Sequence, residues 1–175
     1  HGAGRGQCVA IVASRGIPMM LGQLATLKAG GTYVPVDPAF PQERRLFMLQ
    51  DCRAKVVLSG NAAVEAEDAP EAGQDVQWLD LGHALEAVAS LPADNPGVPK
   101  AECAEAAYVM YTSGSTGKPK GVGNRHVSLF NQLVWMEALF QSGGNDVVLQ
   151  KTPYSFDVSL LELFWPLTNG STLVI

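Results

Sequence analysis

The chain has 175 residues, 47% of them hydrophobic and 17% charged, which is ordinary for a globular protein and allows one domain with a buried core. Its formal net charge of −5 gives no basic surface for nucleic acid. The sequence has neither a basic amphipathic stretch for a membrane surface nor an apolar run long enough to span a bilayer. We therefore expect a cytoplasmic protein that binds neither nucleic acid nor membranes.

The first third of the chain alternates short apolar runs with segments of helical spacing. The sequence predicts strands at 8–14, 33–36 and 54–58, with helices that begin near Pro18 and Pro41 between them. This βαβαβ order predicts an α/β fold, in which a mostly parallel sheet is flanked by helices. Further strands are predicted at 76–81, 107–111, 146–150 and 171–175.

Two helices are predicted in the second half of the chain. The first covers 124–140 and is expected to pack on the sheet through an apolar side made of Val127, Phe130, Leu133, Val134, Met136 and Leu139. The second begins near Phe156 or Asp157, with Ser155 as its cap. Residues 93–105 are rich in proline, alanine and acid, so we expect a surface connection there and an internal boundary at 92–105.

The three cysteines, Cys8, Cys52 and Cys103, lie far apart, and the sequence has neither a C-x-x-C pair nor a cluster of histidines. A disulfide framework and a zinc site are therefore both disfavoured. We expect the cysteines to be small buried side chains in a reducing compartment.

The run YVMYTSGSTGKPKGV at 108–122 joins a predicted strand to ten residues that are almost all Gly, Ser, Thr, Lys or Pro. Its glycines, Gly121 among them, allow positive φ angles and a close approach to a ligand, and its hydroxyls and amides can donate to an anion. A strand, a glycine-rich loop and then a helix N-terminus would cradle phosphates. A flexible linker seldom follows a buried strand directly. A Walker loop is excluded because Pro119 stands where the Mg²⁺-binding Ser or Thr should be.

This run resembles the phosphate-loop motif of the adenylate-forming superfamily, Y-T-S-G-[ST]-T-G-x-P-K-G, and every position of the motif is present. The segment LKAGGTYVPVDPAFP at 27–41 resembles a motif that is typical of the peptide-synthetase branch, although a helix, a glycine stop and a strand also explain it. The resemblance implies that ATP phosphates and Mg²⁺ bind at the loop, with Thr116 as a candidate Mg²⁺ contact. The implied phosphate-binding residues are Thr112, Ser113, Gly114, Ser115, Thr116, Gly117 and Lys120.

The later segment FDVS at 156–159 resembles the next motif of the same superfamily. Alone, Asp157 would be an ordinary carboxylate that complements a helix dipole. The resemblance implies instead that Asp157 holds the α-ammonium group of an amino acid, and that Val158 and Leu161 form an apolar wall of the side-chain pocket.

The function implied by the resemblance is the reaction of an α-amino acid with ATP to give an aminoacyl-adenylate and pyrophosphate. The product would load onto the phosphopantetheine thiol of a carrier domain in nonribosomal peptide synthesis, with condensation domains as further partners. We expect residues 1–175 to be the N-terminal portion of such a domain, a fragment that is inactive alone. Two alternatives stay open: part of an acyl- or aryl-CoA ligase of the same superfamily, and a non-catalytic remnant that binds only a nucleotide or a partner.

Overall fold

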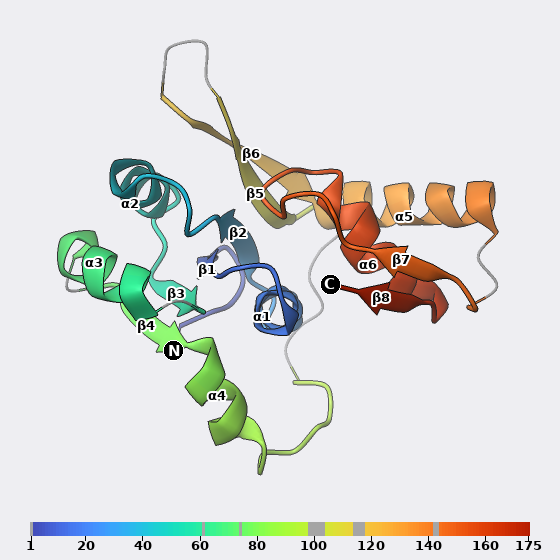
Figure 1. Cartoon of the computed structure of the whole chain (residues 1–175), viewed down its shortest axis with the longest axis horizontal. Coiled ribbons are helices and arrows are strands. Elements are labelled where there is room, and N and C mark those ends of the chain that lie inside the picture. Colours follow the sequence, from blue (N-terminus) through green and yellow to red (C-terminus); the bar gives the residue numbers. More distant parts are fainter. Residues whose placement is uncertain (1, 61, 74, 98–103, 114–117, 142–143) are drawn as a thin grey trace.

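A computed structural model of the chain describes residues 2–60, 62–73, 75–97, 104–113, 118–141 and 144–175. Its main feature is a six-stranded sheet in the order β4-β3-β1-β2-β5-β6 (Figure 1). The first five strands in this order are parallel, and β6 runs antiparallel to β5. The strands are β1 (Cys8–Val12), β2 (Thr32–Val36), β3 (Val56–Ser59), β4 (Gln77–Asp80), β5 (Ala106–Thr112) and β6 (Lys120–Arg125).

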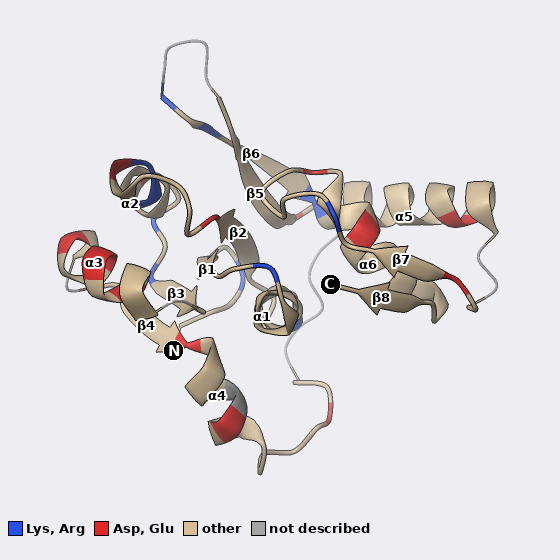
Figure 2. Ribbon diagram, viewed as in Figure 1, with Lys and Arg blue, Asp and Glu red and all other residues tan. Residues whose placement is uncertain are grey.

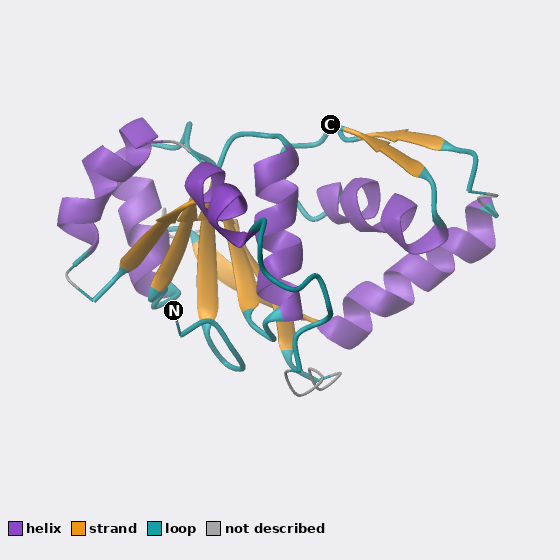
Figure 3. Cartoon of the chain, turned by 90° about the horizontal axis from the view of Figure 1, so that it is seen from below, coloured by secondary structure: helices purple, strands orange, loops and turns teal. Residues whose placement is uncertain are grey.

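Helices cover both faces of this sheet (Figure 3). They are α1 (Ile17–Lys28), α2 (Gln42–Asp51), α3 (Ala62–Ala72) and α4 (Leu81–Val88). Because neighbouring residues of a strand point to opposite faces, Ile11 packs with α1 on one face while Ala10 and Val12 pack with α2 and α3 on the other. The predicted βαβαβ order and mostly parallel sheet are thus confirmed.

Helix α4 is an element that the sequence analysis did not predict. It follows β4 directly, and the Asp80 carboxylate caps it by accepting a hydrogen bond of 2.7 Å from the backbone N–H of His83. An aspartate that precedes an apolar run is an N-cap signal, so the helix start was readable in the sequence.

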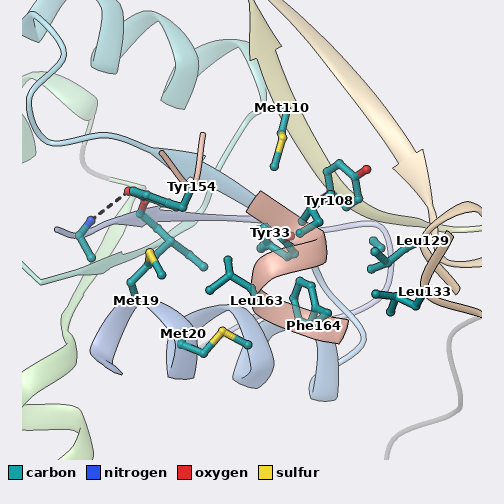
Figure 4. Close-up of a cluster of buried hydrophobic side chains, with 14 of the residues drawn as sticks. Met19, Met20, Tyr33, Tyr108, Met110, Leu129, Leu133, Tyr154, Leu163 and Phe164 are labelled. Atoms are coloured by element: carbon teal, nitrogen blue, oxygen red, sulfur yellow. Dashed lines mark hydrogen bonds between the residues drawn. The ribbon is translucent and has the colours of Figure 1, made fainter. Parts of the chain in front are cut away.

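The last third of the chain forms a smaller layer beside the sheet. It contains α5 (His126–Phe140), α6 (Ser159–Asn169) and a two-stranded parallel sheet of β7 (Val147–Leu149) and β8 (Thr172–Val174). Tyr33, Tyr108 and Phe164 pack together where α6 meets the main sheet (Figure 4).

The prediction that α5 packs on the sheet through its apolar side is wrong for most of that side. Leu129 and Leu133 are buried, and the helix packs chiefly against α6. Most of the predicted side faces outward instead, and Phe130 is 68% exposed. Strand β6 supplies the physical reason, because it forms the edge of the sheet and α5 leaves the sheet there.

The cysteines also differ from expectation. Cys8 and Cys52 are half-buried, and the Cys52 thiol donates a hydrogen bond of 3.5 Å to the carbonyl oxygen of Leu49; Cys103 lies outside the described residues. Interaction with the Cys52 thiol lowers the pKa of Cys8 to about 7, although burial acts in the opposite direction. The same interaction raises the pKa of Cys52, and burial raises it further.

We expect Cys8 to be alkylated by iodoacetamide with a half-maximal rate near pH 7, because the thiolate is the reactive form. Cys52 should react far more slowly. Peptide mapping by mass spectrometry across a pH series measures each cysteine separately. In Cys52→Ala the interaction that lowers the pKa of Cys8 is lost, so the profile of Cys8 should move to higher pH. An unchanged profile in that variant would contradict the assigned cause.

Candidate functional site

The glycine-rich run lies between two antiparallel strands. Thr112 at the end of β5 lies opposite Lys120 at the start of β6, so the described ends of the run lie side by side. Four residues with a predicted role, Gly114, Ser115, Thr116 and Gly117, lie outside the described residues. The Mg²⁺ contact predicted for Thr116 therefore lies outside them as well.

The prediction that this run leads directly into a helix is wrong. Strand β6 intervenes, and α5 begins at His126, next to the pairing of Arg125 with Ala106 at the far end of the strand pair. Six residues of strand extend roughly 20 Å, so the N-terminus of α5 does not face the glycine-rich run. The helix end that was predicted to favour phosphate therefore lies away from this run.

Gly121 has a different role from the one predicted. It lies in β6 opposite Tyr111, and a Cβ added to it would lie 3.0 Å from Cγ1 of Val109 and 3.1 Å from Cζ of Tyr111. Its missing side chain therefore makes room for the Tyr111 ring. That ring in turn donates a hydrogen bond of 2.7 Å from its hydroxyl to Asp51, which ties the end of α2 to β5.

The loop that carries Asp157 is fixed to the same sheet edge as Thr112. The hydroxyl of the buried Tyr154 lies 2.6 Å from the carbonyl oxygen of Val36 and 3.2 Å from that of Ile11, near the carboxyl ends of β2 and β1. Burial raises the pKa of Tyr154, so the hydroxyl stays protonated and donates. Since carboxyl ends of parallel strands meet at one edge, Tyr154 holds this loop beside the end of β5.

Glu162 of α6 fixes the beginning of that loop. Its carboxylate accepts hydrogen bonds from the backbone N–H groups of Lys151 at 3.0 Å and Thr152 at 2.8 Å, and from the Thr152 hydroxyl at 2.7 Å. Burial acts to raise the pKa of Glu162, but the hydrogen bonds, those from Thr152 foremost, outweigh it and lower the pKa. The charged carboxylate therefore anchors the loop.

Asp157 precedes the helix that it was predicted to open. Helix α6 begins at Ser159, its N-cap position is Val158, and no side chain caps it, so the predicted Ser155 cap is wrong. Instead, the Ser159 hydroxyl donates a hydrogen bond of 2.6 Å to the carbonyl of Phe156 and closes the turn that presents Asp157.

One cleft of about 490 Å³ brings together residues from both predicted halves of the site. Thr112 and Ser113 line it from the end of β5, and Asp157 lines it from the loop before α6. All three are exposed, so a ligand can reach them. Its other lining residues are Arg44, Met110, Tyr111, Val122, Asn124, Ser155 and Phe156. The Asp157 charge acts on Tyr108 too: burial first, and Asp157 second, raise the pKa of that tyrosine.

Three predicted residues do not line this cleft. Lys120 is exposed on β6. Val158 is 55% exposed, and Leu161 packs partly against the core. The sequence analysis in turn missed Arg44, which reaches the cleft from α2. No local sequence pattern distinguishes Arg44 from the adjacent Arg45. Only the packing of the side chains shows which of the two arginines forms an ion pair.

Among the residues that the structure describes, no group of three or more His, Cys, Asp or Glu side chains is placed to hold a metal ion. Among the described helices, none is both long and apolar enough to cross a membrane.

The chain belongs to the family of AMP-binding enzymes, whose pattern it matches over residues 1–175. It is 41% identical over 172 residues to phosphinothricin tripeptide synthetase PhsB of Streptomyces viridochromogenes, covering 95% of this chain and 14% of that protein. It is 40% identical over 176 residues to tyrocidine synthase 3 of Brevibacillus parabrevis, covering 100% of this chain and 3% of that protein. The chain thus spans a small part of the length of these relatives.

Solved structures agree with this assignment. A crystal structure of the nonribosomal peptide synthetase FmoA3 in its alpha-methyl-L-serine-AMP bound form superposes with a TM-score of 0.84 at 27% sequence identity. The superposition covers 98% of this chain and 18% of that one. The predicted resemblance to the peptide-synthetase branch and the predicted fold are confirmed.

Proposed function

We propose that this chain is part of an adenylation domain that activates an α-amino acid with ATP for nonribosomal peptide synthesis. The observation that carries the proposal is the shared cleft, in which Thr112 and Ser113 lie with Asp157. Hydroxyls at the start of a glycine-rich run suit phosphate oxygens, and a carboxylate suits an ammonium group. The relatives described above are peptide synthetases, which also supports the proposal.

The proposed reaction requires positioning and charge stabilisation more than covalent catalysis by the protein. The carboxylate of the amino acid attacks the α-phosphorus of ATP, and pyrophosphate leaves. Asp157 would hold the ammonium group, and Thr112 and Ser113 would donate hydrogen bonds to phosphate oxygens. We propose the same role, contact with phosphate oxygens, for the remaining predicted residues, including Lys120.

The residues present fit Mg²⁺ as the accompanying ion. Mg²⁺ prefers oxygen ligands and is usually held by a few protein groups together with substrate phosphates. The described cleft offers the hydroxyl oxygens of Thr112 and Ser113 beside the expected phosphates, which suits that mode. When bound, Mg²⁺ would neutralise charge on the phosphate oxygens, and we propose Thr116 as a contact.

Asp157 favours an amino acid over a plain carboxylic acid, the substrate of an acyl- or aryl-CoA ligase. A substrate that lacks an amine would leave the carboxylate in the cleft without a partner. Such a substrate would therefore bind more weakly. We further propose that the product is loaded onto the phosphopantetheine thiol of a carrier domain, and that condensation domains are neighbours in the same assembly line. The need for ATP and for free thiols places this activity in the cytoplasm.

Amino-acid-dependent exchange between pyrophosphate and ATP tests the proposal in the full-length protein that contains this chain. We expect exchange with one or a few α-amino acids and none with the same acids lacking the amine. Exchange that is equally fast without the amine would support a CoA ligase instead. The hypothesis of a non-catalytic remnant would be supported by two results together: no exchange by the full-length protein, and a melting temperature of the chain that does not change with ATP.

A further inference from the structure

Cys8 and Cys52 lie on the same face of the main sheet, at the edge where its parallel strands begin. Cys8 is the first residue of β1 and points to the same face as Ala10 and Val12, the face that packs with α2. Cys52 is the residue that follows α2. Both cysteines pack against the same buried apolar cluster, although they are far apart in the sequence.

A tight turn carries the chain from Cys52 into the strand beside β1. Arg53 adopts a left-handed conformation with a φ angle of 53°. The backbone N–H of Ala54 then donates a hydrogen bond of 3.1 Å to the carbonyl oxygen of Leu49, which closes the turn. Strand β3 follows directly and pairs with β1. The end of α2, where Cys52 lies, is therefore fixed beside the start of β1.

The two thiols differ in reactivity, which suits a stepwise disulfide exchange. Interaction with Cys52 lowers the pKa of Cys8 to about 7, so about half of the Cys8 thiols are thiolate, the attacking form, at pH 7. The pKa of Cys52 is raised, first by its interaction with Cys8 and then by burial. Once Cys8 is part of a disulfide it carries no charge, so the first of these causes disappears and Cys52 can lose its proton more readily.

Charged residues next to Cys52 favour an anionic reaction partner. Figure 2 shows basic residues in the connection between α2 and β3; they are Arg53 and Lys55, and both are exposed. Asp51 opposes them, and its carboxylate accepts a hydrogen bond of 2.7 Å from the Tyr111 hydroxyl. Two positive charges against one negative charge suit a small disulfide that carries carboxylates better than a neutral one.

We propose that Cys8 and Cys52 form a thiol modification site that exchanges reversibly with a small anionic disulfide, for which glutathione disulfide is the probe. The Cys8 thiolate attacks one sulfur of the probe, a new S–S bond forms, and the first glutathione leaves with the electron pair and takes up a proton. The Cys52 thiol then loses its proton, attacks Sγ of Cys8 and releases the second glutathione in the same way. Overall, two protein thiols become one disulfide, and one glutathione disulfide becomes two thiols.

The new bridge would act next to one wall of the cleft. Tyr111 lines the cleft, and its hydroxyl bonds to Asp51, the residue just before Cys52. A disulfide would join this end of α2 to β1 covalently, and excess thiol would release it. The site therefore gives the fold a reversible constraint, and its existence does not depend on the proposed function.

Peptide mapping under nonreducing conditions tests the site in the full-length protein that contains this chain. After incubation with glutathione disulfide, trypsin should release peptides 6–15 and 46–53 joined by one disulfide, and excess dithiothreitol should separate them. In Cys52→Ala the reaction should stop at a mixed disulfide on Cys8. At pH 7 it should also be about fivefold slower if the pKa of Cys8 returns to its ordinary value of 9.0, because about 50-fold less thiolate is offset by about tenfold greater nucleophilicity.

Cys103→Ser is the matched control, because it removes the third cysteine and should leave the joined peptides unchanged. In urea the same treatment should also join Cys103, since an unfolded chain has no preferred pair. A mixed disulfide on Cys8 without joined peptides in the unaltered protein would overturn the pair, as would an unmodified Cys8. Native bridges from Cys103 that are as frequent as those between Cys8 and Cys52 would overturn it too. Equal melting temperatures of the reduced variants exclude a folding defect.

Discussion

Replacing Arg45 with alanine is expected to destabilise the chain by about 3–5 kcal/mol, because it leaves the Asp68 carboxylate buried without its partner. Asp68 is 0% exposed and accepts two hydrogen bonds from Arg45. The bond to Asp68 raises the pKa of Arg45, although burial opposes it, so the guanidinium is charged in the native state. The free energy of unfolding, measured by urea denaturation, reports the loss.

Two controls separate this effect from a general loss of helix packing. Arg44→Ala, one residue earlier, breaks no ion pair among the described residues and should cost less than about 1 kcal/mol beyond the lost stacking on Phe40. The double variant Arg45→Ala with Asp68→Asn removes the stranded charge as well, so it should be more stable than Arg45→Ala alone. If the double variant were less stable than the single one, the buried charge would not be the cause.

The sheet could be predicted because its strands are buried on both faces. β1 and β2 are continuous apolar runs, and prolines at the starts of α1 and α2 mark the change from strand to helix. Local sequence is sufficient for such elements, since each is bounded by its own turn residues and packs on its neighbours in chain order.

Strand β6 could not be predicted in the same way. Its sequence, KGVGNR, is polar and contains two glycines, and most of it is exposed at the edge of the sheet. Backbone pairing with β5 defines it, and Gly121 is there to make room for Tyr111. Because this strand was not predicted, a helix N-terminus was wrongly expected beside the glycine-rich run. The packing of α5 was predicted wrongly for a related reason. The spacing of apolar residues identifies one side of a helix, but it does not identify the element that packs against that side.

The candidate site was partly predictable. Motif resemblance selected Thr112, Ser113 and Asp157, but their proximity depends on contacts between residues far apart in sequence. The Tyr154 hydroxyl joins the loop before α6 to Ile11, across 143 positions. Arg44 had no motif to mark it, and only the comparison of its surroundings with those of Arg45 singles it out.

Asp157→Asn is expected to reduce kcat/KM for the amino acid about 10- to 100-fold in pyrophosphate exchange by the full-length protein, the loss of one charge-assisted contact to the ammonium group. The side-chain size is kept, and the hydrogen bond that Asp157 makes among the described residues comes from its backbone carbonyl, so the melting temperature should stay unchanged. The KM for ATP should change little, because Thr112 and Ser113 are intact. Asp146→Asn, an exposed aspartate before β7, makes the same change in charge outside the cleft and should have no effect.

The comparison that decides the role of Asp157 uses two substrates that differ only in the amine. If Asp157 pairs with the ammonium group, the variant should lose activity toward the amino acid and gain relative activity toward the acid without the amine, because a neutral amide no longer needs a positive partner. An equal loss toward both acids would mean that Asp157 acts on a feature they share, such as the geometry of the turn before α6. The selectivity ratio therefore tests the pairing itself, independently of how much total activity the variant retains.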